Sequence, residues 1–144
     1  MNKVISFSSL IVVLMMGACK KDELTMQESK INQLTSAPWK AVSVESAIDG
    51  DLTIQYIGFS ISFLKNEQAG YNGEYYVLHG GVAFKDTFGK WKFNDDQTVI
   101  QFDNGLELEA ILAGNQLTIT VIVEPPLGGR VNGLSGKFTF VLKH

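Results

Sequence analysis

Apolar and polar residues alternate with a period of two through the last third of the chain, and this pattern limits what the chain can fold into. Leu117, Ile119, Val121 and Val123 are separated by the single residues Thr118, Thr120 and Ile122. Successive side chains of a β-strand point to opposite faces, so this spacing gives a strand one apolar face. The sequence therefore predicts strands with one face on a core.

The same alternation recurs upstream, broken by short polar connections such as Asp103-Asn104-Gly105 and Gly114-Asn115, which tolerate positive φ. Short connections imply that successive strands pair antiparallel. The predicted strands are 39–46, 56–65, 71–79, 88–93, 98–103, 106–113, 116–124 and 137–143. We predict an all-β fold, an eight-stranded antiparallel up-and-down barrel, because closure removes the edges of such a sheet.

A barrel in the outer membrane is the rival architecture. It would turn its apolar residues outward and need strands of about 9–11 residues. The predicted strands are shorter, and acidic and basic side chains such as Glu107, Glu109, Lys90 and Lys92 would face lipid. The sequence favours the barrel with an apolar interior.

Alternation places large aromatic residues on the inner face of the predicted barrel. Such rings line ligand pockets and also fill cores, and an eight-stranded barrel can be filled or can hold one small ligand. Both interpretations stay open. The candidate ligand-lining residues are Phe59, Phe63, Trp91, Phe93, Phe102, Phe138 and Phe140.

The residues of the first strands and their flanks resemble a known group of proteins. Leu34 followed by Ala37-Pro38-Trp39, then Gly89-Lys90-Trp91-Lys92-Phe93, Asp95-Asp96 and Thr98-Val99-Ile100, resemble the small lipocalin-like lipoproteins of Bacteroidetes-type bacteria. The resemblance covers about residues 34–143 and is a pattern of strands and tryptophans. It implies a lipocalin-like barrel, usually without known chemistry.

The N-terminus has the features of a targeting signal. Val4 to Met16 is apolar, and Leu14-Met15-Met16-Gly17-Ala18-Cys19 resembles a bacterial lipoprotein signal. The resemblance implies diacylation of the Cys19 thiol and cleavage just before it. A transmembrane helix is the alternative, but it needs about 20 apolar residues and this run is roughly 15. We expect a signal peptide at 1–18, a lipidated tether at 19–37 and the barrel domain at 38–144.

The residues after Cys19 bear on the location. Lys20-Lys21-Asp22-Glu23 resembles the export signal of surface-displayed lipoproteins, which implies an outer-membrane protein facing the cell surface. The periplasmic face of the same membrane is the second choice. In either case the lipid anchor makes the membrane a partner.

A short helix is predicted within the tether. Thr25-Met26-Gln27-Glu28 has the spacing of a capping box, in which side chains bond the free N–H groups of a first helical turn. Ile31 and Leu34 stand three residues apart, so one edge of the helix would be apolar. We expect this edge to rest on the barrel.

Charge and composition exclude several function classes. The net charge is −3 and Arg130 is the only arginine, so the chain lacks the positive stripe that nucleic acid requires. Cys19 is the only cysteine, which rules out an internal disulfide.

No segment has the pattern of a catalytic, cofactor or metal site. His79 is the only internal histidine, and we interpret it as structural, at the end of a strand. Asp95-Asp96 and Asp49-Gly50-Asp51 lack the spacing of a calcium loop and are interpreted as turns. The glycine-rich stretch 125–136 does not fit a phosphate loop, but its length suits either a lid or contact surface or a simple connection. We therefore expect no enzyme activity, no cofactor and no metal.

Two functions remain. The first is a lipid-anchored envelope protein that binds a small apolar ligand in the barrel cup. The second is an accessory module that binds an envelope protein, with a packed interior and an exposed apolar patch around Ile122 and Val141, which alternation places outside.

Overall fold

The chain forms a closed β-barrel with one short helix, in a computed structural model that describes residues 25–125 and 135–144. The predicted signal peptide, Cys19, the charged residues after it and most of the glycine-rich stretch 125–136 lie outside these residues. The elements, in chain order, are α1 (Met26–Leu34), β1 (Trp39–Ser46), β2 (Gly50–Asp51), the 3-10 helix η1 (Thr53–Tyr56), β3 (Ser60–Gln68), β4 (Tyr71–Leu78), β5 (Phe88–Phe93), β6 (Val99–Phe102), β7 (Glu107–Ala113), β8 (Gln116–Val123) and β9 (Gly136–Lys143).

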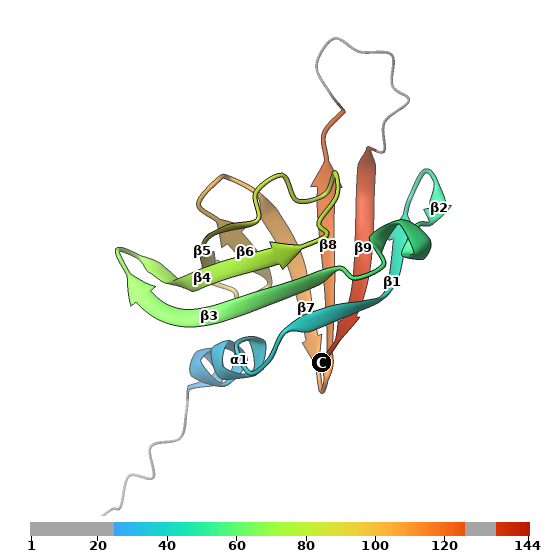
Figure 1. Cartoon of the computed structure of the whole chain (residues 1–144). Helices are drawn as coiled ribbons and strands as arrows, with labels where there is room; N and C mark the ends of the chain where they lie inside the picture. The colour runs from blue at the N-terminus through green and yellow to red at the C-terminus, as the bar shows by residue number, and fades with distance from the viewer. Residues whose placement is uncertain (1–24, 126–134) are drawn as a thin grey trace, which may run out of the picture.

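Each strand from β3 to β8 pairs antiparallel with the next one along the chain, and β9 pairs back onto β1 (Figure 1). This confirms the eight-stranded antiparallel up-and-down barrel. The alternating residues of β8 and β9 fall in register, with Ile119 opposite Phe140 and Val121 opposite Phe138. The two-residue β2, which the sequence pattern did not predict, pairs antiparallel with the far end of β1.

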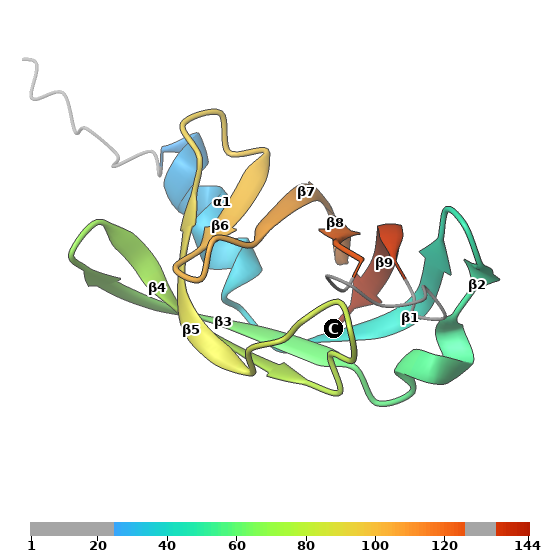
Figure 2. The same cartoon turned by 90° about the horizontal axis from the view of Figure 1, so that it is seen from above.

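β1 changes partners along its length. Its first two residues, Trp39 and Lys40, pair with β3, whereas the pairing with β9 runs from Lys40 to Ser46. Figure 2 shows β1 diverging from β3 beside η1. Leu52 and Thr53 lie in this gap and bond to β1. Leu52 N–H donates to the Val44 carbonyl at 2.8 Å, and Val44 N–H donates to the Thr53 hydroxyl at 3.1 Å.

The prediction of a strand over 56–65 was wrong at its start. Tyr56 belongs to η1, and Gly58 adopts φ +82°, a conformation that breaks a strand and that glycine tolerates. The apolar residues Tyr56, Ile57 and Phe59 led to the prediction of a strand here. A short helical turn followed by a bend can carry the same apolar residues as the start of a strand.

Most inward residues of the barrel are completely buried. β8 is the clearest case: Leu117, Ile119 and Val121 are fully inaccessible, while Ile122 between them and Val123 is 56% exposed. Glu107 and Glu109 on β7 are exposed, as the alternation predicted. The hydrophobic effect therefore fixes which face of each strand is inside.

α1 covers one end of the barrel. Its capping box forms, with Glu28 N–H donating to the Thr25 hydroxyl and Thr25 N–H donating to the Glu28 carboxylate. Ile31 and Leu34 are buried, as predicted. The Gln33 side chain donates to the carbonyl of Gly114, in the turn that joins β7 and β8. None of the helices in the described ranges is both long and apolar enough to cross a bilayer.

The junction between α1 and β1 is fixed by Trp39. Its indole N–H donates to the Leu34 carbonyl at 2.8 Å, which satisfies an acceptor at the helix end. The ring of His144, the last residue, lies on Trp39 with centroids 3.8 Å apart. The start and the end of the described chain therefore meet on one buried tryptophan.

Gly73 on β4 sets the spacing between β3 and β4. A β-carbon there would overlap the carbonyl oxygen of Leu64 on the neighbouring strand. We predict that Gly73→Ala lowers the free energy of unfolding by about 3 kcal/mol or more, since the backbone must move to admit the methyl group.

Gly105→Ala is the matched control for this prediction. Gly105 has φ +89° but open space around it. Its replacement should cost only the backbone strain of about 1–2 kcal/mol. Urea unfolding of both variants measures the difference, and equal losses would show that the β3–β4 contact is not tight.

Candidate functional site

The seven aromatic residues predicted to line a ligand cup all reach the barrel interior, but to different degrees. Six of them are no more than 5% exposed, and only Phe93, at a barrel end, is half-buried. Their side chains therefore lie where the alternation placed them. Whether they line space or fill it depends on what they contact.

Two groups of rings occupy the interior. In the first, Phe140 lies 4.8 Å from Phe59, centroid to centroid, and 5.0 Å from Tyr56, with Phe138 packed 6.4 Å from Tyr56. We call these rings, together with Phe84, the Phe140 cluster. The rings contact one another at normal aromatic distances.

The second group surrounds Phe63 and Trp91. Their centroids are 5.4 Å apart, Phe93 lies 5.6 Å from Trp91, and Phe102 lies 6.5 Å from Phe63. Phe102 also stacks on Tyr75 at 3.7 Å with nearly parallel planes. In both groups the predicted rings pack mainly against other rings.

Three further buried rings escaped the sequence analysis. Tyr56 lies on η1, and Phe84 lies in the connection between β4 and β5, where no strand periodicity marks it. Tyr75 lies on a predicted strand, and its inward position could have been read from its spacing with Val77. Only this last residue had a usable signal in the sequence.

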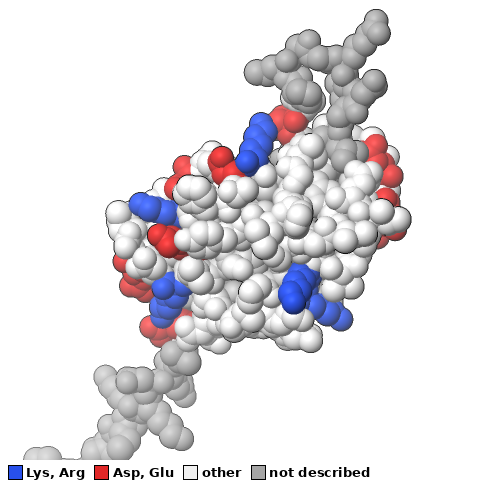
Figure 3. All heavy atoms as spheres, viewed as in Figure 1, with Lys and Arg blue, Asp and Glu red and all other residues white. Residues whose placement is uncertain are grey.

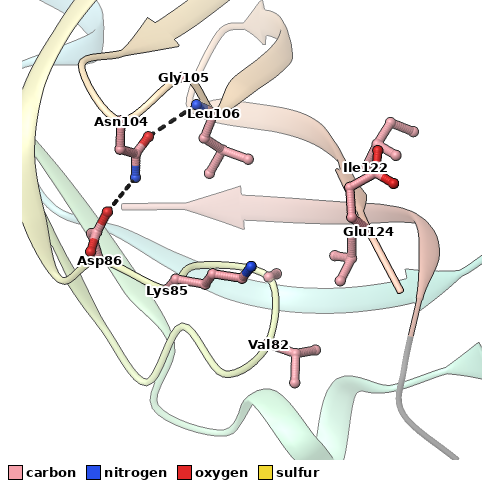
Figure 4. Close-up of a pocket in the computed structure, with 10 residues that line it drawn as sticks. Val82, Lys85, Asp86, Asn104, Gly105, Leu106, Ile122 and Glu124 are labelled. Atoms are coloured by element: carbon pink, nitrogen blue, oxygen red, sulfur yellow. Dashed lines mark hydrogen bonds between the residues drawn. The ribbon is translucent and has the colours of Figure 1, made fainter. Parts of the chain in front are cut away.

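Open space occurs at the end of the barrel away from α1. A pocket of about 280 Å³ lies between the β4–β5 connection, the β6–β7 turn and the end of β8 (Figure 4). We call it the mouth pocket. Its lining mixes apolar and charged side chains: Val82, Ala83, Lys85, Asp86, Asn104, Gly105, Leu106, Ile122, Val123 and Glu124.

The polar wall of the mouth pocket is held in place by Asn104. Its amide N–H donates to the Asp86 carboxylate at 2.7 Å, and its carbonyl accepts the N–H of Leu106 at 3.0 Å. Figure 4 shows both bonds, with Lys85 on the same side and Ile122 and Glu124 across the hollow. Such a site offers apolar contact with a few fixed polar groups, as small-molecule sites do.

A second pocket, of about 240 Å³, lies at the opposite end between α1 and strands β5 to β8. Phe93 and Leu34 line it, and Phe93 is the one predicted ligand-lining residue found in either pocket. Lys30 lies across it, with its ammonium group donating to the Gln97 carbonyl at 3.3 Å. The helix therefore covers this space.

Tyr75 lies between the Phe63 group and the mouth pocket. Burial, followed by the negative charges of Asp103 and Asp86, raises the pKa of Tyr75 to about 12. Its hydroxyl is 3.5 Å from the Asn104 amide nitrogen. The phenol is therefore neutral at physiological pH and helps to support the polar wall.

Tyr56, unlike Tyr75, has no polar group bonded to its hydroxyl among the described residues, although this hydroxyl is buried. Burial raises the pKa of Tyr56, and the nearby backbone of Ala83 offsets part of this rise. The two groups do not have the geometry of a hydrogen bond. The hydroxyl therefore remains a neutral donor with nothing to donate to.

The polar residues that sequence analysis set aside as structural take part in turns. His79 is exposed, with φ +53°, and its ring lies over Gly58. The Asp51 carboxylate accepts the N–H of Thr53 at 2.9 Å, and bonds to the hydroxyl and N–H of Thr53 lower its pKa. Asp95 and Asp96 lie in the turn between β5 and β6. In the described ranges no three acidic, histidine or cysteine side chains are grouped to hold a metal.

The two residues predicted to mark an outer apolar patch differ. Ile122 is 56% exposed and lies at the mouth pocket, whereas Val141 is half-buried on β9. Other exposed apolar side chains of the sheet are Leu78 on β4, Phe88 on β5 and Ile111 on β7.

The raised pKa of Tyr75 predicts an alkaline loss of stability. The unfolded chain releases this proton near the ordinary value of 10.0, before the folded chain does. The free energy of unfolding should therefore fall between about pH 10 and 12, by at most about 1.4 kcal/mol per pH unit for this group. Tyr56 contributes in the same direction.

Tyr75→Phe should make this fall shallower, as measured by urea unfolding at pH 9 and pH 11. Tyr76→Phe, which removes an exposed phenol on the same strand, is the control. An unchanged slope in the Tyr75 variant would contradict the assignment.

Comparison with known proteins adds no identity. No protein-family model matches the sequence, and a search of curated proteins finds no match.

Proposed function

We propose that this chain is a lipid-anchored, non-catalytic envelope protein that binds a small, mainly apolar ligand at the open end of its barrel. The mouth pocket carries the proposal, because it combines concave apolar walls with a fixed polar wall built by Asn104 and Asp86. The packed ring groups make the deep interior a support for this site rather than a free cup.

The anchor is proposed from the sequence alone. The apolar run ending in Cys19 resembles a lipoprotein signal, and an acylated Cys19 would carry more than one chain, which anchors a protein stably. Lys20-Lys21-Asp22-Glu23 favours the cell-surface face of the outer membrane, with the periplasmic face as the second choice. The resemblance to small lipocalin-like lipoproteins supports the same proposal.

Acylation is tested by growing cells that express the chain with an alkyne-tagged palmitate. We expect label on the wild-type chain and its complete loss in Cys19→Ser, because no other thiol is available. Protease added to intact cells then distinguishes the two faces of the membrane. Label on the Cys19→Ser chain would contradict the anchor.

Ligand binding is tested with residues 20–144, which contain α1 and every strand. The neutral fluorescent probe N-phenyl-1-naphthylamine should bind, and Val82→Trp should weaken binding at least about tenfold by filling the mouth pocket, a loss of about 1.4 kcal/mol.

Leu64→Trp is the matched control for this titration. Leu64 and Val82 are both 46% exposed, but Leu64 lies on β3 outside the pocket. Equal weakening by both substitutions, or no binding to the wild-type chain, would overturn the mouth pocket as the ligand site.

Binding of an envelope protein is the second candidate function, favoured by an exposed apolar face. Tyr76 on β4 pairs with Phe88 on β5, and they are 46% and 70% exposed, beside Leu78 at 62%. Figure 3 shows few charged side chains over the middle of the face formed by β3 and β4. Exposed apolar surface of this kind often marks an interaction site. Crosslinking in cells through this face would favour the second candidate.

A further inference from the structure

The unpaired hydroxyl of Tyr56 calls for a physical explanation. Tyr56 is 2% exposed, and its oxygen has no hydrogen-bond partner among the described residues. Buried polar groups are nearly always paired, because an unsatisfied one loses its bonds to water without replacement. A molecule that brought an acceptor to this oxygen would recover that loss.

Phe84 belongs to the same ring cluster as Tyr56. It lies in the connection between β4 and β5, yet it is only 4% exposed. Its ring lies 5.3 Å from Phe59 and 5.6 Å from Phe140, which also contacts Tyr56. A single aromatic side chain from an irregular segment therefore completes the Phe140 cluster.

The segment that carries Phe84 lies between the mouth pocket and Tyr56. Ala83 lines the pocket, and its backbone lies near the Tyr56 hydroxyl. A β-carbon at Gly81 would lie 3.2 Å from the Tyr56 ring, so the backbone passes directly over it. Moving this segment outward would join the mouth pocket to the Phe140 cluster.

Few bonds hold the segment in place. Among the described residues, Phe84 N–H donates to the Gly80 carbonyl at 3.2 Å within the segment. Its end is held by the bond of Asp86 to Asn104 and by Val77 N–H, which donates to the Thr87 carbonyl at 2.7 Å. Its entry is strained at one residue, since His79 adopts φ +53°, which a non-glycine residue rarely does. Its position therefore depends mainly on burial of the Phe84 ring.

We propose that Phe84 occupies a ligand site of the barrel, and that an uncharged molecule with an apolar ring and an adjacent oxygen acceptor displaces it and accepts a hydrogen bond from Tyr56. The inference rests on the proposed ligand-binding function and deepens it. The ring of the ligand takes the place of the Phe84 ring against Phe59 and Phe140. A charged molecule is disfavoured, because the site is built of aromatic side chains.

This arrangement makes the wild-type affinity depend on opening of the segment. A ligand that binds only the open form has an apparent Kd raised by the reciprocal of the open fraction. The Phe84 ring competes with the ligand for the site, and a shorter side chain competes less. The affinity for the ligand should therefore rise from wild type to Phe84→Leu to Phe84→Ala. A buried apolar cavity left by a missing side chain can bind a small aromatic molecule.

The probes are acetophenone and α-methylstyrene, which have nearly the same shape but differ in the carbonyl oxygen. We measure their Kd values for residues 20–144 by amide chemical shifts, with signals of residues 80–84 reporting displacement of the segment. We expect acetophenone to bind about tenfold more tightly than α-methylstyrene to wild type and both Phe84 variants. Tyr56→Phe should abolish this preference.

Phe63→Ala is the matched control, because Phe63 is equally buried but belongs to the other ring group, away from Tyr56. The cavity that it opens should bind both probes equally, while the site beside Tyr56 keeps the wild-type preference for acetophenone. Phe84→Leu keeps most of the apolar volume and so provides a folded variant if Phe84→Ala unfolds.

Three results would overturn the inference. They are an absent carbonyl preference, a preference that persists in Tyr56→Phe, and wild-type binding that leaves the signals of residues 80–84 unchanged. If N-phenyl-1-naphthylamine still binds and Val82→Trp still weakens it, the mouth pocket remains a ligand site and only the displacement of Phe84 fails. If neither probe set binds, both proposals fail.

Discussion

The barrel depends on β1 forming hydrogen bonds on both of its edges. Its pairing with β9 closes the sheet, while its pairing with β3 covers only Trp39 and Lys40. Open edges leave backbone groups unpaired, so the far half of β1 needs another partner. Residues 50–56 provide it, through the pairing of β2 with Glu45 and Ser46 and through the Leu52–Val44 and Thr53–Val44 bonds. The same segment brings Tyr56 into the interior, so closure of the sheet and the unusual hydroxyl have one origin.

The strands were predictable where one face is buried and the other is solvated. Apolar residues recur at every second position from Leu117 to Val123 and from Phe138 to Leu142, and both segments form strands that match their predicted ranges closely. The prediction failed around Tyr56, where three apolar residues lie in a helical turn and a bend. Local pattern could not distinguish these cases, because the gap beside β1 that selects the turn is created by strands distant in sequence.

The site was less predictable than the fold. Alternation identified rings that point inward, but not whether they enclose space, because that depends on how rings from five or more strands meet. Phe84 had no periodic signal at all, and it is buried only because the β4–β5 connection folds over the barrel end. The mouth pocket likewise combines residues from two connections and from the end of β8, and Asn104 was recognised in the sequence only as part of a turn.

The position of α1 makes the two ends of the barrel different. The helix is bonded to the turn at Gly114, just before β8 begins, whereas the mouth pocket is lined by Ile122 to Glu124, where β8 ends (Figure 1). The length of β8 therefore separates the segment that leads to the N-terminus from the opening. A barrel held by that terminus would present its opening outward, to molecules arriving from the surrounding medium rather than to the surface that holds it.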